Sequence, residues 1–460
     1  MMPKSPIDQV IPDGMLVREC TLPGETRSDG VVPSHANGIQ LSRDRFLILY
    51  STLGFQGRDD GRSGVYRLVT NDWTGPLIKE GFISQTRKST GAASDGRVYT
   101  TQVGHLTAFG VPRGALVNGR RVAHENHFVV MWRECGRMTD ARGHLCWPEP
   151  GQEAHGAQAL EMQFRLNDQG DDIEIIRPAQ PLRQQGMPDG QICRWPEVGE
   201  LIKGYVPAVP MNAECSEWLD LNTASERDGI DPSLKPRSSV LPSQYRWDPS
   251  REVYNWVASG PLWGTDLFEG SIARNGSSFV FHARMLGFEG ASYVERDEFT
   301  RVAAWCRPDN PILGPYRDVR PREQPNWHPT SVFALPDGSI ARLGGAPQER
   351  YRRGRGPIYL VRIDPNNGFR AIEHVRLREV DEFPRIEVPG DPYLDFPKLL
   401  PHVGGREQLI AHRVYTSAMW RDPSQPYEVS PQALAANGCG LYFVRVRYRE
   451  ELPPAWIFEK

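Results

Sequence analysis

The stretch Gly-Val-Tyr-Arg-Leu-Val at residues 64–69 places apolar or aromatic residues at alternate positions, the pattern of a β-strand with one buried face. A six-residue run of the same kind returns five more times along the 460-residue chain. The further copies span residues 160–165, 252–257, 301–306, 357–362 and 440–445. Most copies run into a cluster of Asp, Asn, Gly and Pro, as tight turns do. Repeated strand-and-turn units over a long chain predict a β-propeller.

A second strand pattern lies upstream of most copies. The clearest example runs from Trp327 to Leu343 and contains the hairpin turn Pro-Asp-Gly at residues 336–338. Six blades are predicted, with five or seven left open. Their ranges are roughly 30–80, 85–175, 190–260, 262–320, 325–378 and 393–450.

The sequence therefore predicts an all-β protein with a single propeller domain over residues 30–455 and an N-terminal extension over residues 1–29. Long loops between strands are expected at residues 105–158 and 205–250, because these segments are rich in Pro, Gly, Arg and acidic residues.

Composition excludes several classes of function. The net charge is −3 with 24% charged residues, which gives no overall attraction to nucleic acid or to an anionic membrane. The seven cysteines show no CxxC spacing, so neither a disulfide framework nor a zinc site is expected. Motifs for nucleotide cofactors are missing, and only a structural calcium bound by backbone carbonyls is left open. The first residues lack a signal-peptide pattern, which predicts a cytoplasmic protein, or a secreted one if a leader precedes this sequence.

Polar residues at the starts of the predicted inner strands identify a candidate pocket. Alignment of four such strands on their apolar positions puts His35, Phe268, His328 and Phe396 in one layer. The inner strands of a propeller surround its axis, so their polar side chains are expected to converge. The converging set is predicted to be His35, Asn37, Glu269, His328 and Lys398.

A carboxylate pair is the predicted catalytic core. Glu269 lies at the expected axial end of a strand beside Phe268, and aromatic surroundings favour the neutral form that a general acid needs. The loop at residues 57–61 contains Arg58, Asp59 and Asp60 and follows the second strand of the first blade. Asp59 or Asp60 could pair with Glu269 as in a glycosidase, and Arg58 could bind a substrate carboxylate.

Other polar residues are predicted to bind substrate. His124 and His127 precede the strand that begins at Phe128. Arg413 and Tyr415 alternate, so their side chains share one face of a strand. Further polar strand residues are His105, His282, Arg284, Arg342 and His412.

The first blade resembles the opening of sialidase-superfamily (BNR-repeat) propellers. The resemblance lies in the run Ser-His-Ala-Asn-Gly at residues 34–38, in the Gly-Arg-Asp-Asp-Gly loop at 57–61 and in the strand that follows. The run Phe-Glu-Gly at 268–270 resembles the strand that carries the general acid in arabinanase-like hydrolases. Propeller polysaccharide lyases and rhamnosidases, with axial His, Tyr and Arg, are a third similar group. These resemblances imply a propeller that acts on carbohydrate, with Glu269 as acid and Asp59 or Asp60 as base.

Three functions stay open at this stage. The first is a glycoside hydrolase that uses the carboxylate pair, with His35, His328 and the arginines positioning an oligo- or polysaccharide. The second is a polysaccharide lyase, in which His and Tyr carry out β-elimination at a uronic acid and Arg neutralises the carboxylate. The third is a sugar-binding propeller without catalysis. The substrate is expected to be a sugar chain, with an anionic uronate or sulfated chain left open.

Overall fold

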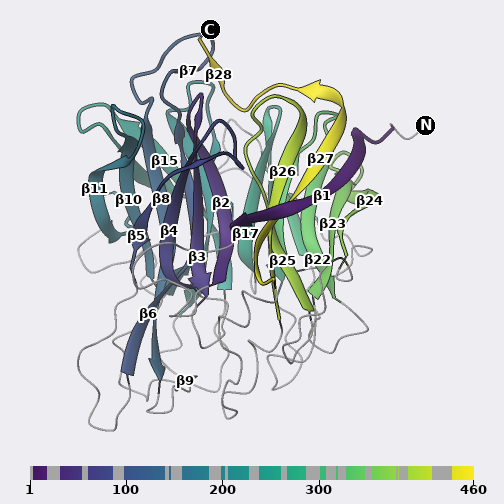
Figure 1. The fold of residues 1–460 in the computed structure, drawn as a ribbon, viewed down its shortest axis with the longest axis horizontal. Coiled ribbons are helices and arrows are strands. Elements are labelled where there is room, and N and C mark those ends of the chain that lie inside the picture. The colour runs from purple at the N-terminus through teal and green to yellow at the C-terminus, as the bar shows by residue number, and fades with distance from the viewer. Residues whose placement is uncertain are drawn as a thin grey trace.

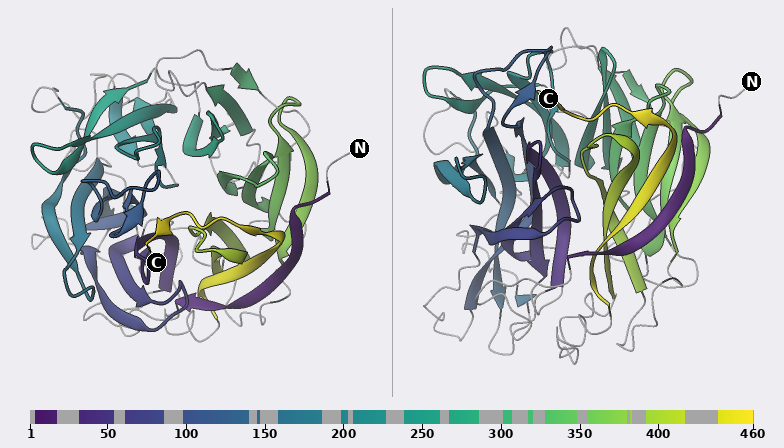
Figure 2. Two further views of the ribbon diagram at one scale, coloured as in Figure 1. Left: turned by 90° about the horizontal axis from the view of Figure 1, so that it is seen from above. Right: turned by 45° about the horizontal axis from the view of Figure 1, so that its top comes forward.

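The computed structural model describes most of the chain. The described residues are 4–17, 32–53, 61–85, 98–139, 145–146, 158–185, 198–202, 206–226, 238–260, 267–285, 301–306, 317–319, 328–347, 355–379, 382, 392–416 and 438–459. Among them there are 28 β-strands and no α-helix. Figure 1 shows the strands standing side by side, and Figure 2 shows them arranged as a ring about a central axis. The predicted all-β propeller is confirmed.

The strands form antiparallel units of four, which follow one another along the chain. Units 1 and 2 consist of β2 (Val32–Ser42), β3 (Arg45–Leu53), β4 (Gly61–Thr70) and β5 (Leu77–Ser84), then β6 (Val98–Val111), β8 (His127–Thr139), β10 (Gln158–Leu166) and β11 (Ile173–Pro181). Unit 3 consists of β12 (Val198–Ile202) with β13 (Val209–Pro210), then β14 (Glu217–Glu226), β15 (Ser238–Asp248) and β16 (Val253–Ser259). Unit 4 consists of β17 (Leu267–Asn275), β18 (Ser278–Met285), β19 (Arg301–Cys306) and β20 (Arg317–Val319).

The last two units close the ring. Unit 5 consists of β21 (His328–Ala334), β22 (Ile340–Pro347), β23 (Arg355–Asp364) and β24 (Arg370–Arg378). Unit 6 consists of β25 (Pro392–Leu399), β26 (Gly405–Thr416), β27 (Gly440–Leu452) and β1 (Ile7–Val17). Three short strands complete the set: β7 (Ala115–Leu116), β9 (Leu145–Cys146) and β28 (Ile457–Phe458).

Hydrogen bonding groups the described strands into five sheets, because two pairs of units share a sheet. Units 1 and 2 are joined by the single residue pair Gly61 and Val103, and units 5 and 6 by Arg355 and Tyr393. The fifth sheet is the short pair β7–β28. The first strands of neighbouring units contact one another, as β2 does with β6 and β21 with β25, so these strands line the axis.

The N-terminal segment is a correction to the predicted domain limits. Residues 7–17, expected within an extension, form β1, which pairs along β27 from Ile7 to Val17 and supplies the outer strand of unit 6. The first and last parts of the chain therefore share one sheet, which closes the ring (Figure 1).

The expected loops at 105–158 and 205–250 are also corrected. The described parts of these segments contain most of β8, β14 and β15, because apolar residues alternate there despite the Pro and Arg content. Five of the six repeated runs are third strands of their units, whereas residues 252–257 fall in β16, an outermost strand.

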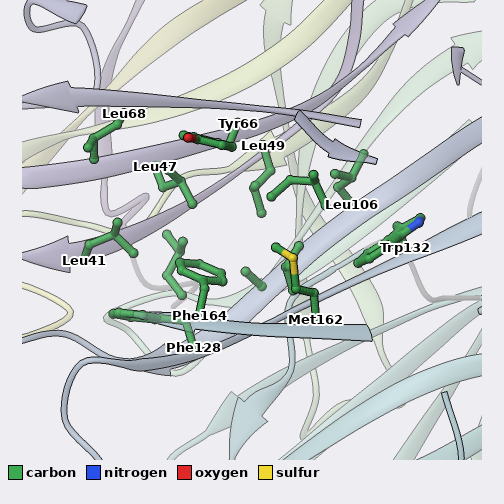
Figure 3. Close-up of a cluster of buried hydrophobic side chains, with 14 of the residues drawn as sticks. Leu41, Leu47, Leu49, Tyr66, Leu68, Leu106, Phe128, Trp132, Met162 and Phe164 are labelled. Atoms are coloured by element: carbon green, nitrogen blue, oxygen red, sulfur yellow. The ribbon is translucent and has the colours of Figure 1, made fainter. Parts of the chain in front are cut away.

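The core consists of hydrophobic clusters between successive units. In the described part of the chain there are six, one at each junction around the ring. Between units 1 and 2, Leu47 and Leu49 of β3 pack with Phe128 and Trp132 of β8 and Phe164 of β10 (Figure 3). Each unit buries both of its faces against neighbours, so the packing supports the ring as a whole and holds the inner strands in fixed register.

Candidate functional site

A β-bulge occurs at the same place in five of the inner strands. In β2 the regular pairing with β3 is interrupted between Ser34 and Asn37. In β6 it is interrupted between Gly104 and Thr107, and in β25 between Asp395 and Lys398. Strands β17 and β21 show the same interruption, from Phe268 to Ser271 and from His328 to Ser331. A bulge inserts an extra residue and so changes the direction of the side chains next to it. Because the bulge is repeated, the equivalent residues of the five strands form one layer around the axis.

Three bulge residues have a left-handed backbone and meet one another. His35, His105 and Phe396 hold equivalent positions in units 1, 2 and 6, with φ angles of 53°, 57° and 51°. The ring of His35 lies 5.2 Å from that of His105 and 4.1 Å from that of Phe396, both edge to face. A left-handed backbone is unfavourable for a large side chain and is found mainly where the surrounding structure imposes it, often at functional sites.

Strand β26 adds two polar side chains to this group. The guanidinium of Arg413 donates from Nη1 to Ser34 Oγ at 3.0 Å and to His35 Nε2 at 3.2 Å. Its Nη2 donates to the Tyr415 hydroxyl oxygen at 2.6 Å. The same guanidinium lies 4.3 Å from the ring centre of Phe396 and 4.0 Å from that of Tyr415. We call the seven residues Ser34, His35, Ser51, His105, Phe396, Arg413 and Tyr415 the axial cluster.

The hydrogen bonds assign the proton on His35. A guanidinium can only donate, so His35 Nε2 must accept from Arg413 and carries no proton. The proton is then on Nδ1, which lies 3.1 Å from both Ser34 Oγ and Ser51 Oγ. Ser51 in turn donates to the Ser34 carbonyl at 3.3 Å. Protonating Nε2 would set two cations about 3 Å apart, which costs about 5 kcal/mol at an effective dielectric constant of ~20.

The axial cluster is buried. Ser34 and Ser51 are fully inaccessible, and the exposed fraction is only 4% for His105 and 1% for Arg413. A buried polar network needs its hydrogen bonds satisfied, and the donors and acceptors given above match one another. The sequence predicts an axial pocket, and the described residues form a packed polar cluster at the bulges of the inner strands.

The predicted layer of pocket residues is correct for two strands and shifted by one residue in the other two. His35 and Phe396 are equivalent, as predicted, but the bulge residue of β17 is Glu269 rather than Phe268. In β21 the equivalent residue is Pro329, and His328 lies one position earlier. The described structure gives the backbone of Glu269 and His328, while their side chains lie outside it.

Asn37 connects two neighbouring bulges. Its Nδ2 donates to the carbonyl of Leu106 at 2.6 Å, inside the bulge of unit 2. At the equivalent position of unit 5, Ser331 Oγ donates to the carbonyl of Pro397 at 2.7 Å, inside the bulge of unit 6. Lys398 holds this same position in unit 6 and is buried, with 3% exposed. The first residue after the bulge thus ties one unit to the next.

Arg58, Asp59 and Asp60 lie outside the described residues. The described residues on either side, Leu53 and Gly61, pair with each other at the ends of β3 and β4. Leu53 is two residues beyond Ser51, a member of the axial cluster, so the chain leaves β3 about 7 Å further along the strand.

His124 and His127 do not join the axial cluster. His127 pairs with Val111 at the far end of β6, six residues from His105, which is about 20 Å along a strand. His124 Nε2 donates to the Glu214 carbonyl at 2.9 Å, and burial lowers the pKa of this histidine. His127 packs 4.7 Å from the ring of Trp247. Both histidines are part of the packing between units 2 and 3, and their substrate-binding role stays a prediction.

His105, Ser34 and Ser51 belong to the cluster, although the sequence pattern does not assign them to the pocket. A signal for His105 exists, because Gly-His-Leu-Thr at 104–107 repeats the polar and apolar order of Ser-His-Ala-Asn at 34–37. Ser51 shows no such signal, since only its pairing with Ser34 reveals its position.

A second histidine–arginine contact lies beside the cluster. His412 is the neighbour of Arg413 on β26 and is 1% exposed. Its Nε2 accepts from Arg378 Nε at 3.3 Å. Burial, reinforced by the Arg378 charge, lowers the pKa of His412 to about 3, so this histidine is neutral at ordinary pH.

Metal binding finds no support within the described ranges, where no group of three or more His, Cys, Asp or Glu side chains could hold an ion. In the same part of the chain, no helix has the length and apolar character needed to cross a membrane.

Comparison with known proteins shows the fold. No family model and no curated protein matches the chain. Among solved structures, a protein of unknown function from Dyadobacter fermentans is similar over 96% of this chain and 99% of that one, at 12% identity and a TM-score of 0.53. Trypanosoma rangeli sialidase is similar over 91% of this chain but only 55% of its own length, at 9% identity and a TM-score of 0.52. The Hadza microbial sialidase Hz136 is similar over 91% and 66%, at 12% identity and a TM-score of 0.51. The chain is thus distantly similar in structure to sialidases, and identities this low establish the propeller architecture alone.

Proposed function

We propose that the protein is a carbohydrate-active enzyme that hydrolyses a glycosidic bond of an oligo- or polysaccharide at the axial cluster. The observation that carries the proposal is the meeting of His35, Arg413 and Tyr415 at bulges with left-handed backbone. Units 6, 1 and 2 all contribute to this group. Ring closure needs apolar packing between units, whereas a strained polar cluster on the axis is typical of a binding or catalytic site.

Hydrolysis needs an acid and a base or nucleophile on opposite sides of the bond. Glu269 is our proposed general acid, because its backbone holds the bulge position equivalent to His35 in unit 4. Asp59 or Asp60 is the proposed partner, in the segment between the paired residues Leu53 and Gly61. Tyr415 is the alternative nucleophile, since some glycosidases use tyrosine and the Arg413 donor at 2.6 Å would stabilise negative charge on its oxygen.

An anionic sugar is the proposed substrate class. The described cluster supplies a guanidinium from Arg413, and Lys398 lies buried on the neighbouring inner strand. A uronate, a sulfated sugar or a sialic acid would complement these charges. The structural similarity to sialidases supports including sialylated glycans among the substrates to be tested.

A lyase is the second candidate, favoured by one specific observation. β-Elimination needs a base, a proton donor for the leaving oxygen and a cation on the uronate carboxylate. Tyr415 and Arg413 are groups of two of these kinds in direct contact, and the base would be a group other than His35, whose Nε2 accepts from Arg413.

The test is a screen of the purified protein against plant, algal and host glycans, including sialylated ones. Release of reducing ends would be measured together with ultraviolet absorbance, because elimination creates a conjugated double bond and hydrolysis does not. Reducing ends without absorbance, lost in Glu269→Gln with binding retained, support the hydrolase. Absorbance that rises with the reducing ends would replace it with the lyase. Binding without any turnover would leave a sugar-binding propeller and contradict both enzyme proposals.

A further inference from the structure

Two histidines hold the same bulge position in neighbouring units, yet their surroundings differ. His35 and His105 share a left-handed backbone and lie with ring centres 5.2 Å apart. His35 has both ring nitrogens within hydrogen-bond distance of protein side chains: Nδ1 of Ser34 and Ser51, and Nε2 of Arg413. A general base needs a lone pair directed at the substrate, and the lone pair of His35 Nε2 is directed at a guanidinium.

We propose that His35 is a positioning residue, which stays neutral with its proton on Nδ1 and orients the guanidinium of Arg413 toward Tyr415. This inference rests on the proposed function only for its effect on turnover. It excludes His35 as the base of the lyase alternative and gives it the task of positioning a protein group, Arg413, in the same site.

The direction of each hydrogen bond supports this role. Ser51 donates to the Ser34 carbonyl, which leaves its oxygen to accept from His35 Nδ1. His35 Nε2 and Ser34 Oγ then both accept from Arg413 Nη1, which fixes the plane of the guanidinium. Fixing that plane aims Nη2 at the Tyr415 oxygen, 2.6 Å away. The bonds run from unit 1 to unit 6, across the junction at which the ring closes.

The groups around His35 disfavour its protonation. Among the described residues, the titratable or charged side chains that contact His35 or its partner Arg413 are His105 of β6, and Arg413 and Tyr415 of β26. His412 is next to Arg413 on β26 and contacts Arg378 instead, because neighbouring strand residues face opposite sides. Arg413 is a cation in direct contact with His35. Strands β2 and β3 contribute the hydroxyls of Ser34 and Ser51, which carry no charge.

The first test measures the histidine itself and requires no substrate. The full chain, labelled with nitrogen-15 in its 11 histidines, would be titrated by NMR between about pH 5 and about pH 8, where an ordinary histidine gains its proton. The His35 resonances, assigned by their loss in His35→Gln, are expected to show a neutral ring with the proton on Nδ1 throughout. A His35 signal that titrates in this range, or that shows the proton on Nε2, would overturn the proposal even if no substrate is ever found.

The second test uses a conservative variant and a matched control. Glutamine can place its amide oxygen near the position of His35 Nε2, so His35→Gln keeps an acceptor for Arg413, whereas His35→Leu does not. With a substrate from the screen, we expect kcat/KM to fall on the order of 100-fold in His35→Leu and to be largely kept in His35→Gln, with an unchanged pH profile. His105→Gln puts a glutamine into the same left-handed backbone conformation, and its unfolding midpoint shows what that substitution costs in stability. Equal losses of kcat/KM in His35→Gln and His35→Leu, with unfolding midpoints lowered no more than in His105→Gln, would show that His35 acts on substrate directly. Should the screen find no turnover, the proposed function fails while the NMR titration still decides the role of His35.

Discussion

Histidines lie in buried, aromatic surroundings at two places along strand β6, but their contacts differ. At the bulge in the middle of the strand, called the bulge end below, His105 meets His35 and Phe396 in a left-handed backbone, next to the guanidinium of Arg413. Beside the last residue of the strand, called the far end, His124 donates to a backbone carbonyl and His127 packs against Trp247 in ordinary interface packing. A histidine before a strand is therefore not informative by itself. What distinguishes the bulge end is imposed backbone strain together with side-chain partners from three units.

The largest expected effect is a loss of turnover when the axial cluster is altered, compared with no loss when the far end of β6 is altered. Tyr415→Phe removes the hydroxyl that accepts from Arg413, and we expect kcat to fall by about 100- to 10,000-fold if that oxygen takes part in proton transfer or nucleophilic attack. The measurement is steady-state kinetics on a substrate from the screen. His127→Gln, at the other end of β6, is the matched control and should retain the parental kcat. A Tyr415→Phe enzyme that works as well as the parent would exclude Tyr415 from the chemistry.

A fall in pH should reduce the unfolding free energy more through His412, beside the axial cluster, than through His124 at the far end of β6. The pKa of His412, beside Arg413, falls from 6.5 to about 3 in the folded protein, so the unfolded chain binds this proton more readily. The stabilising contribution is complete above about pH 6.5 and is lost as pH falls toward 3, on the order of 5 kcal/mol in total. Burial raises the pKa of Glu161, which makes the folded protein more stable as pH falls and so opposes the effect of His412. The contribution of His412 is therefore the difference between the parent and a His412 variant.

We therefore expect His412→Gln to lose less unfolding free energy than the parent between about pH 7.5 and about pH 4.5. Denaturant titrations at both pH values would measure this, with His124→Gln as the far-end comparison, since the pKa of His124 is lowered by burial as well. If the two variants flattened the dependence equally, the stronger desolvation assigned to His412 would be refuted.

The sequence predicted the architecture because strand repeats and turn clusters are local signals. It also placed His35 and Phe396 in one layer, and Arg413 and Tyr415 on one face of a strand. It could not predict the bulge, since one extra residue changes the register without changing the apolar pattern. For that reason the apolar pattern predicts Glu269 one layer too late and makes His328 equivalent to His35. Ser51 and His105 depend on pairing between strands, which no local pattern encodes.

The contacts that connect neighbouring bulges offer a smaller test. Asn37→Ala leaves the Leu106 carbonyl without its side-chain donor, and we expect a loss of about 1–3 kcal/mol in unfolding free energy. Ser331→Ala removes the equivalent bond to Pro397 and should cost a similar amount, but it supports only the bulge of Phe396, whereas Asn37 connects the bulges of His35 and His105. Kinetics should therefore respond more to Asn37→Ala. Equal kinetic losses in the two variants would mean that the whole ring of bulges, and not the junction of units 1 and 2, sets the geometry of the cluster.

The smallest effect is expected at the far end, and it is the one that most sharpens the comparison. His124→Gln can retain a donor toward the Glu214 carbonyl, so unfolding free energy should change by about 1 kcal/mol or less, without any change in kcat/KM. His124→Leu removes the donor from a buried position and should cost about 1–3 kcal/mol, again without a kinetic effect. Denaturant unfolding and kinetics on the same preparations would test both statements. A kinetic defect in His124→Gln, with stability unchanged, would show that substrate reaches the far end of β6 and that burial among aromatics does not separate a packing histidine from a functional one.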